Sequence, residues 1–229
     1  MKRFWKEAAA VAADGGWGVA LDGRAVRTPA RAPLVVESRA LAEAIAAEWQ
    51  AQGETIDPAA MPLTGLANAA IDLARADLAG FAAPIAAYAE SDLLCYRDDR
   101  DAMLQGEQAA AWNPLLAWAE ARHGIEFALA QGVLPIDQPE ATQAALRGAV
   151  LALDPFRLAA LAPLVTIGGS LVAALALVET AFATDALWDA VSLDELYQER
   201  RWGADGEAQK ARARREADWH NAARFLTLL

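Results

Sequence analysis

The chain has 229 residues, enough for one large domain or for a small domain joined to a larger one. Hydrophobic residues make up 55% of it, and this share excludes disorder over most of the length. The formal net charge of −11 argues against nonspecific nucleic-acid binding, because neutralising phosphates requires a basic face. The same charge would attract a basic patch on a partner.

The N-terminal part has the features of a small β-rich module. Residues 17–21 alternate large and small side chains after a glycine-containing turn, and Asp22-Gly23 is a strong two-residue hairpin signal. Residues 34–36 form another short strand-like run. We expect three or four strands, which are too few to be stable alone, so the module should pack against the segments that follow.

A helix should follow this module, capped by Ser38 and running to about Gln52. Beyond Pro62 the pattern is almost wholly helical, and residues 126–135 could hold a short strand pair. The expected helices cover residues 63–74, 77–89, 105–122 (bent at Asn113-Pro114), 139–153, 155–167, 170–182, 184–202 and 205–228. The predicted fold class is therefore α+β. A small β-rich N-terminal domain with one helix (residues 1–60) is packed on a larger all-α domain (residues 61–229).

One segment resembles a membrane span. Residues 158–178 contain no charge, and about 20 apolar residues cross a bilayer. We expect a break at Gly168-Gly169 that gives two shorter buried helices, and a structural adaptor held at a membrane by this run remains an alternative. The single cysteine, Cys95, allows no intramolecular disulfide and is typical of a reducing compartment. We expect a cytoplasmic protein.

The sequence lacks the common catalytic patterns. No lysine follows a glycine, as a Walker A loop requires, and two histidines with one cysteine are too few for a zinc site built from those residues. We therefore predict no catalytic, cofactor-binding or metal-binding residue, and no enzymatic activity. A carboxylate-dependent enzyme with a cleft around Glu195, Asp205 and Glu207 remains the alternative from a different functional class.

Polar residues at regular spacing mark residues 48–72, in a sequence otherwise rich in alanine. Thr64, Asn68 and Asp72 are four residues apart and share one helical face. With Glu48 and Gln52 they are best interpreted as a hydrogen-bonded network that joins the β module to the helices.

A second polar region covers residues 194–207. On a helix, one face would carry Glu195, Gln198, Glu199 and Trp202, at positions i, i+3, i+4 and i+7. Gly203 should end this helix, and Asp205 should lie at or near the N-cap of the next. Two interpretations stay open: Trp202 fills the core of a helix–corner–helix motif, or it anchors a protein partner.

Short motifs spread over nearly the whole chain resemble the family of F1-ATP synthase assembly chaperones that bind the unassembled α subunit in mitochondria and α-proteobacteria. The matching motifs are RFWK (3–6), LDGR (21–24), Thr28-Pro29, EWQAQ (48–52), MPLTGLANAAID (61–72), SDLLCYR (91–97), WNPLLAWA (112–119), Gly169-Ser170 and YQERRWGADGE (197–207). The resemblance implies a small β-rich domain on a larger helical one, and a chaperone without ATPase activity. Its role would be to shield the apolar surface that the α subunit later buries against β.

The resemblance also implies a functionally important acid just after the Trp-Gly pair. Asp205 and Glu207 are both candidates, because Gly206 lies where some members have that acid. With their helical neighbours they form the predicted partner-binding set: Glu195, Gln198, Trp202, Asp205 and Glu207. The implied partner is the F1 α subunit, with no nucleic acid, no stable membrane insertion and no cofactor. The implied location is the bacterial cytoplasm, or the mitochondrial matrix for eukaryotic relatives.

Overall fold

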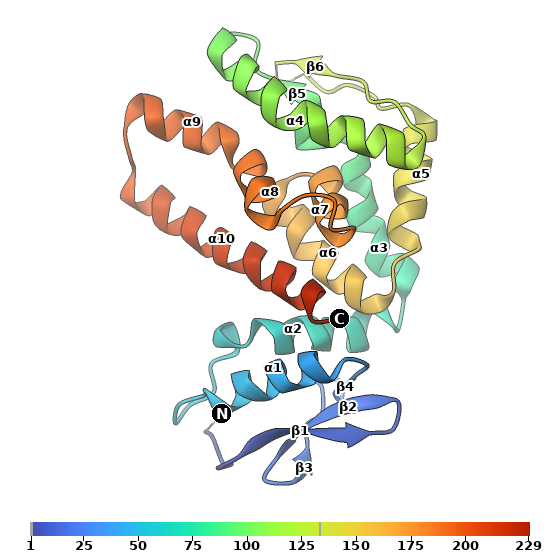
Figure 1. The fold of residues 1–229 in the computed structure, drawn as a ribbon, viewed down its shortest axis with the longest axis vertical. Helices are drawn as coiled ribbons and strands as arrows, with labels where there is room; N and C mark the ends of the chain where they lie inside the picture. The colour runs from blue at the N-terminus through green and yellow to red at the C-terminus, as the bar shows by residue number, and fades with distance from the viewer. Residues whose placement is uncertain (1, 133) are drawn as a thin grey trace. The chain divides into compact units, whose positions relative to one another are not determined.

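The computed structural model describes residues 2–132 and 134–229 and has the expected α+β class, with a small sheet near the N-terminus followed by helices (Figure 1). The chain divides into two compact units. Unit 1 comprises Met1–Phe81, Asp154–Ala160 and Asn221–Leu229, and unit 2 comprises Ala82–Leu153 and Leu161–His220. The boundaries of these units differ from those of the expected domains, residues 1–60 and 61–229. The division into those two domains stays a prediction.

The sheet of unit 1 is antiparallel. β1 (Ala8–Ala13) pairs with β2 (Gly16–Leu21), whose other side pairs with β3 (Arg24–Ala25) and β4 (Val35–Val36). The predicted hairpin at Asp22-Gly23 is confirmed, since both residues have positive φ (47° and 79°), as a type I′ turn requires. The Asp22 carboxylate accepts hydrogen bonds from the backbone N–H groups of Lys6 and Glu7, which hold the preceding segment against the turn.

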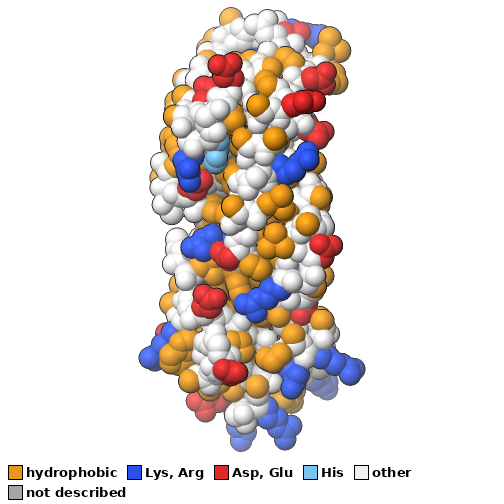
Figure 2. Space-filling model, turned by 90° about the vertical axis from the view of Figure 1, so that its right-hand side faces the viewer, with side chains coloured by type: hydrophobic (Ala, Val, Ile, Leu, Met, Phe, Trp, Pro, Cys, Tyr) orange, Lys and Arg blue, Asp and Glu red, His pale blue; other side chains and the backbone are white. Residues whose placement is uncertain are grey.

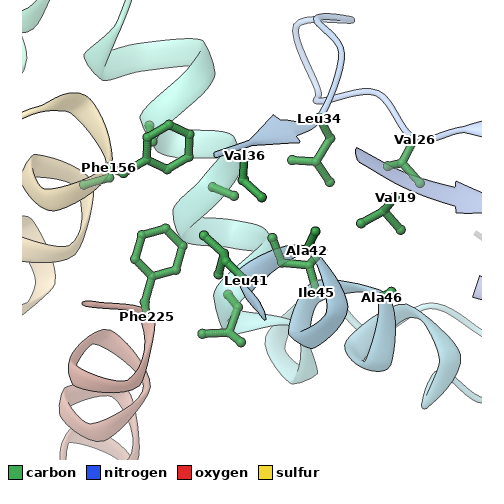
Figure 3. Close-up of a cluster of buried hydrophobic side chains, with 14 of the residues drawn as sticks. Val19, Val26, Leu34, Val36, Leu41, Ala42, Ile45, Ala46, Phe156 and Phe225 are labelled. Carbon is green, nitrogen blue, oxygen red and sulfur yellow. The ribbon is translucent and has the colours of Figure 1, made fainter. Parts of the chain in front are cut away.

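The helices of unit 1 cover one side of this sheet. α1 (Arg39–Gln50) is capped by Ser38, as expected, and η1 (Pro58–Ala60), α2 (Pro62–Ala69) and the π-helical η2 (Ala70–Ala74) follow. Figure 3 shows the core between them, where Val19, Val26, Leu34 and Val36 from the sheet side meet Leu41 and Ile45 from α1. The rings of Phe156 and Phe225 stack in the same cluster, with their centroids 6.4 Å apart. Segments from late in the chain therefore complete the core of unit 1.

The remaining elements are mostly helical. They are α3 (Leu78–Ala86), η3 (Ala87–Glu90), η4 (Leu93–Cys95), α4 (Ala102–His123), α5 (Glu140–Leu151), α6 (Pro155–Gly168), α7 (Leu171–Val178), α8 (Thr184–Val191), α9 (Leu193–Trp202) and α10 (Gly206–Thr227). The uncharged run at residues 158–178 is split between α6 and α7, because Gly169 takes a left-handed φ of 65°. Among the described residues, no helix combines the length and the apolar character needed to span a bilayer.

Residues 8–13, an alanine-rich run with high helix propensity, form strand β1 because they pair with β2 over six residues. Two local expectations were wrong. Residues 184–202 form two helices, α8 and α9, that meet at Ser192. The region at 126–135 contains no pair of its own in the described part, and β6 (Ala130–Gln131) pairs in parallel with β5 (Tyr96–Arg97).

Candidate functional site

Helix α9 and the part of α10 up to His220 form an antiparallel hairpin in unit 2 (Figure 1). The chain reverses at Gly203, whose φ of 94° is open to glycine and strained for other residues. Charged side chains tie the two helices together: Arg212 pairs with Glu199 at 2.5 Å, and Arg215 pairs with Glu195. Because Arg212 is only 16% exposed, its pair with Glu199 is screened less than a surface pair. These contacts hold the hairpin in a fixed geometry.

The hairpin is also fastened to α4. The Tyr197 hydroxyl donates to the Asp101 carboxylate at 2.7 Å, and Arg201 pairs with the same carboxylate at 2.8 Å. These partners lower the pKa of Asp101, with the Tyr197 hydrogen bond as the largest cause. Arg200, the residue before Arg201 on α9, pairs with Glu107 of α4. The C-terminal end of α9 is therefore held next to the first turns of α4.

Three of the predicted residues lie within residues 202–207, at the tip of the hairpin. Trp202, the last residue of α9, is 73% exposed, so the interpretation that it fills the core is wrong. Asp205 caps α10, as predicted, because its carboxylate accepts from the Ala208 N–H at 2.8 Å. Glu207 is 87% exposed and pairs with Lys210 at 2.9 Å. The tip of the hairpin therefore carries an exposed indole and two exposed acids.

The other two predicted residues lie further down α9. Gln198 is exposed one turn before Trp202, on the same helix. Glu195 is in the first turn, about 10 Å from Trp202 along the helix axis at about 1.5 Å per residue, and its carboxylate contacts Arg215. In the structure, the Glu195 side chain joins α9 to α10. A role of Glu195 in partner binding stays a prediction.

Two surface features near the hairpin were not predicted from the sequence. Met103 is 69% exposed and lies in the first turn of α4, next to Asp101, the residue that pairs with Arg201. A groove of about 640 Å³ also opens between α4, α8 and α9, with an apolar lining that includes Leu115, Phe182 and Leu196. No sequence signal could identify this groove, because one of its walls, α4, lies far from α8 and α9 in the chain.

The polar seam at residues 48–72 is a structural network in unit 1. The Glu48 carboxylate accepts from the Leu63 N–H, the Thr64 N–H and the Thr64 hydroxyl, at 2.7–2.8 Å, and so caps the first turn of α2. The Asp72 carboxylate accepts from the Thr28 hydroxyl at 2.6 Å and from the Ala30 N–H at 2.9 Å. The network interpretation is confirmed for these residues, and it accounts for the motif without a ligand.

The SDLLCYR motif has a structural explanation as well. Asp92 is fully buried, and its carboxylate accepts from the Leu94 N–H at 3.0 Å and from the Val172 N–H at 2.9 Å, at the start of α7. Burial raises the pKa of Asp92 to about 6, against the effect of these hydrogen bonds. Burial likewise raises the pKa of the Cys95 thiol to about 12, so this thiol is inert at neutral pH.

Negative charge is concentrated in unit 2. Unit 1 contains ten Lys and Arg against eleven Asp and Glu, whereas unit 2 contains ten against twenty. Among residues 2–132 and 134–229, no group of three or more His, Cys, Asp and Glu side chains could hold a metal ion. The fold and the hairpin tip thus define a class: an α+β protein whose acidic helical unit presents a helix–turn–helix corner with an exposed tryptophan.

Comparison with known proteins gives the family. A family model described as ATP12 chaperone protein matches residues 2–120. Crystal structures of Atp12 from Paracoccus denitrificans and of an aspartate-to-lysine mutant of it are each 40% identical, with a TM-score of 0.93 over 99% of this chain and 97% of theirs. The Atu1473 protein from Agrobacterium tumefaciens is 38% identical, with a TM-score of 0.93 over 99% of this chain and 85% of its own.

A more distant relative is the mitochondrial protein atp12 of Schizosaccharomyces pombe, 25% identical over 215 residues, which cover 89% of this chain and 74% of its own length. The chain belongs to the ATP12 chaperone family. The resemblance found from the sequence motifs is confirmed, and with it the role of a chaperone.

Proposed function

We propose that this protein binds the unassembled α subunit of F1-ATPase and shields its apolar interface until the α subunit pairs with β. Membership of the ATP12 chaperone family supports an assembly role. An unassembled subunit of an obligate oligomer exposes a large apolar surface that aggregates readily. A chaperone for it needs a rigid surface and moderate affinity, so that the client can pass to its permanent partner. We further propose that the protein acts in the bacterial cytoplasm.

One observation carries the choice of site: Trp202 is 73% exposed at the end of a helix that charged contacts join to α4 and α10. A large aromatic side chain in water is costly for a monomer, and tryptophan is enriched among residues that dominate binding energy. Asp205 and Glu207 follow it in the sequence, both exposed, and would attract basic groups on the client. Gln198 extends this surface by one turn of α9.

The distribution of charge supports a protein client. Acidic residues outnumber basic ones two to one in unit 2, which contains the hairpin tip. The face in Figure 2 shows acidic, basic and apolar side chains interspersed, so the excess negative charge is not gathered into one patch there. Such a surface suits electrostatic steering toward a basic partner, followed by local apolar contact at Trp202.

The carboxylate-dependent enzyme receives little support from the geometry. Glu195 contacts Arg215, Asp205 caps α10 and Glu207 pairs with Lys210, so each carboxylate has a different partner. None of the three lines the groove between α4, α8 and α9. Paired acids in an enclosed cleft, the arrangement expected for acid–base catalysis, are not formed by these three residues.

The test is retention of purified α subunit by the immobilised protein, compared between wild type, Trp202→Ala and Glu207→Gln. Trp202→Ala should weaken binding by about 2 kcal/mol, roughly 30-fold. Glu207→Gln should lower the association rate and its dependence on salt. The matched control is Glu216→Gln, which removes an exposed acid from α10 away from the tip. Equal binding by Trp202→Ala and wild type would show that the hairpin tip is not the binding site. A wild type that does not bind the α subunit would refute the proposed function.

A further inference from the structure

The outer border of the sheet in unit 1 is unusually open. Among the described residues β1 pairs with β2 alone, so one side of β1 has no neighbouring strand. The opposite border of the sheet consists of β3 and β4, which are only two residues long. Short edge strands resist pairing with other chains, but a six-residue strand is long enough to act as a template.

One hydrogen bond shows which backbone groups face outward. The N–H of Ala8 donates to the Gln50 side chain at 2.8 Å, so it points away from β2. Backbone groups alternate along a strand with a period of two, so the N–H and C=O groups of Ala10 and Ala12 point to the same side. Ala12 is exposed, and in the described residues neither Ala10 nor Ala12 makes a hydrogen bond beyond its own strand ladder.

The usual protections of an edge strand are missing from β1. Its sequence, AAAVAA, has no charge and no proline, and its register with β2 is continuous, without a bulge. Gln50 covers only the first residue. Val11, whose side chain is 38% exposed, lies in the middle. Only an extended backbone can satisfy donors and acceptors that repeat every second residue along one line.

We propose that this border of β1 binds an extended segment of the client protein as an added β-strand. The inference rests on the proposed function for the identity of the client. A second copy of this chain is a poorer occupant, because two edges of alanine and valine would bury far less than the roughly 1,200 Å² of a stable interface. A client also held at the hairpin tip would not need the edge to supply the whole affinity.

A proline substitution tests this directly. Ala12→Pro removes an N–H that points outward, and proline is tolerated at such positions of an edge strand. Ala12→Ser places a small polar side chain at the same exposed position but keeps the N–H. Binding to purified α subunit should be at least tenfold weaker for Ala12→Pro than for Ala12→Ser, while both variants keep the unfolding midpoint of the wild type within a few degrees.

Amide hydrogen exchange gives a second, independent measurement on wild type. The N–H groups of Ala10 and Ala12 should exchange quickly in the free protein and slowly in the complex, whereas the N–H of Val11, which faces β2, should be slow in both. Equal affinity of the two Ala12 variants, with no new protection at Ala10 and Ala12, would overturn the added strand while leaving the proposed function intact. Protection that appears at high protein concentration without the α subunit would identify a second copy as the occupant. Wild type that does not bind the α subunit would overturn both proposals.

Discussion

The Glu48 carboxylate offers the sharpest test of whether the most polar motif of this chain is structural. It accepts three hydrogen bonds at the start of α2, from the N–H groups of Leu63 and Thr64 and from the Thr64 hydroxyl. Leu63 is fully buried and Thr64 is 5% exposed, so water replaces the lost acceptor poorly. Hydrogen bonds to a charged group contribute about 1.5–3 kcal/mol each, and Glu48 itself is half-buried. Glu48→Ala should therefore lower the free energy of unfolding by about 3 kcal/mol.

The assay is urea unfolding followed by tryptophan fluorescence, with Glu43→Ala as the matched control on the same helix. Glu43 is exposed and makes only an i,i+4 pair with Arg39, so its removal should cost a few tenths of a kcal/mol. Glu48→Gln, which keeps one acceptor oxygen, should fall between the two. If Glu48→Ala costs no more than Glu43→Ala, the capping role is refuted. If Glu48→Ala is fully folded but no longer binds the client, residues 48–72 take part in binding as well as in the fold.

Three further outcomes follow from single contacts. Trp202→Ala should change the unfolding midpoint by less than about 2 °C, because the side chain is 73% exposed, and a larger drop in calorimetry would contradict an exposed anchor. Asp205→Asn should keep the cap of α10 whereas Asp205→Ala should lose about 1 kcal/mol, and equal stability of the two variants would count against the cap. The hydrogen bond to Asp185 raises the pKa of His220 above its usual 6.5. The pair therefore stabilises the folded state fully below pH 6.5, and this stabilisation is lost as the pH rises through the higher pKa that His220 has in the folded state. Thermal unfolding of Asp185→Asn across this range should show the wild-type advantage shrinking as pH rises, and a constant difference would disprove the assignment.

Asp92 adds a prediction of the same sign in a lower pH window. Burial raises its pKa from 3.8 to about 6, so between these values the folded state holds a proton that the unfolded state has lost. This contribution to stability falls as pH rises through that window and stays lower above it. Stability measured for Asp92→Asn relative to wild type should therefore improve as pH rises from 3.8 to 6. A relative stability that declines over the same range would show that the carboxylate is held ionised.

Local signals in the sequence identified much of the architecture. Asp22-Gly23 predicts a hairpin because both residues tolerate positive φ, and Ser38 and Asp205 predict helix starts because their side chains can accept from backbone N–H groups in the first turn. Each of these signals acts within a few residues. The family resemblance likewise rests on short motifs whose order along the chain can be read directly.

The candidate site depended on contacts that no local pattern contains. The sequence left open whether Trp202 fills a core or lies at the surface. Its exposure was decided by the tertiary structure, in which Arg212, Arg215 and Asp101 hold α9 between two other helices. Only tertiary pairing makes a strand of the alanine run at residues 8–13, since alanine by itself favours a helix. The sequence therefore determined the class, the family and the turns and caps, whose energies are local. The tertiary structure decided which side chains are exposed and which backbone edge is free, because burial and strand pairing depend on residues distant in the chain.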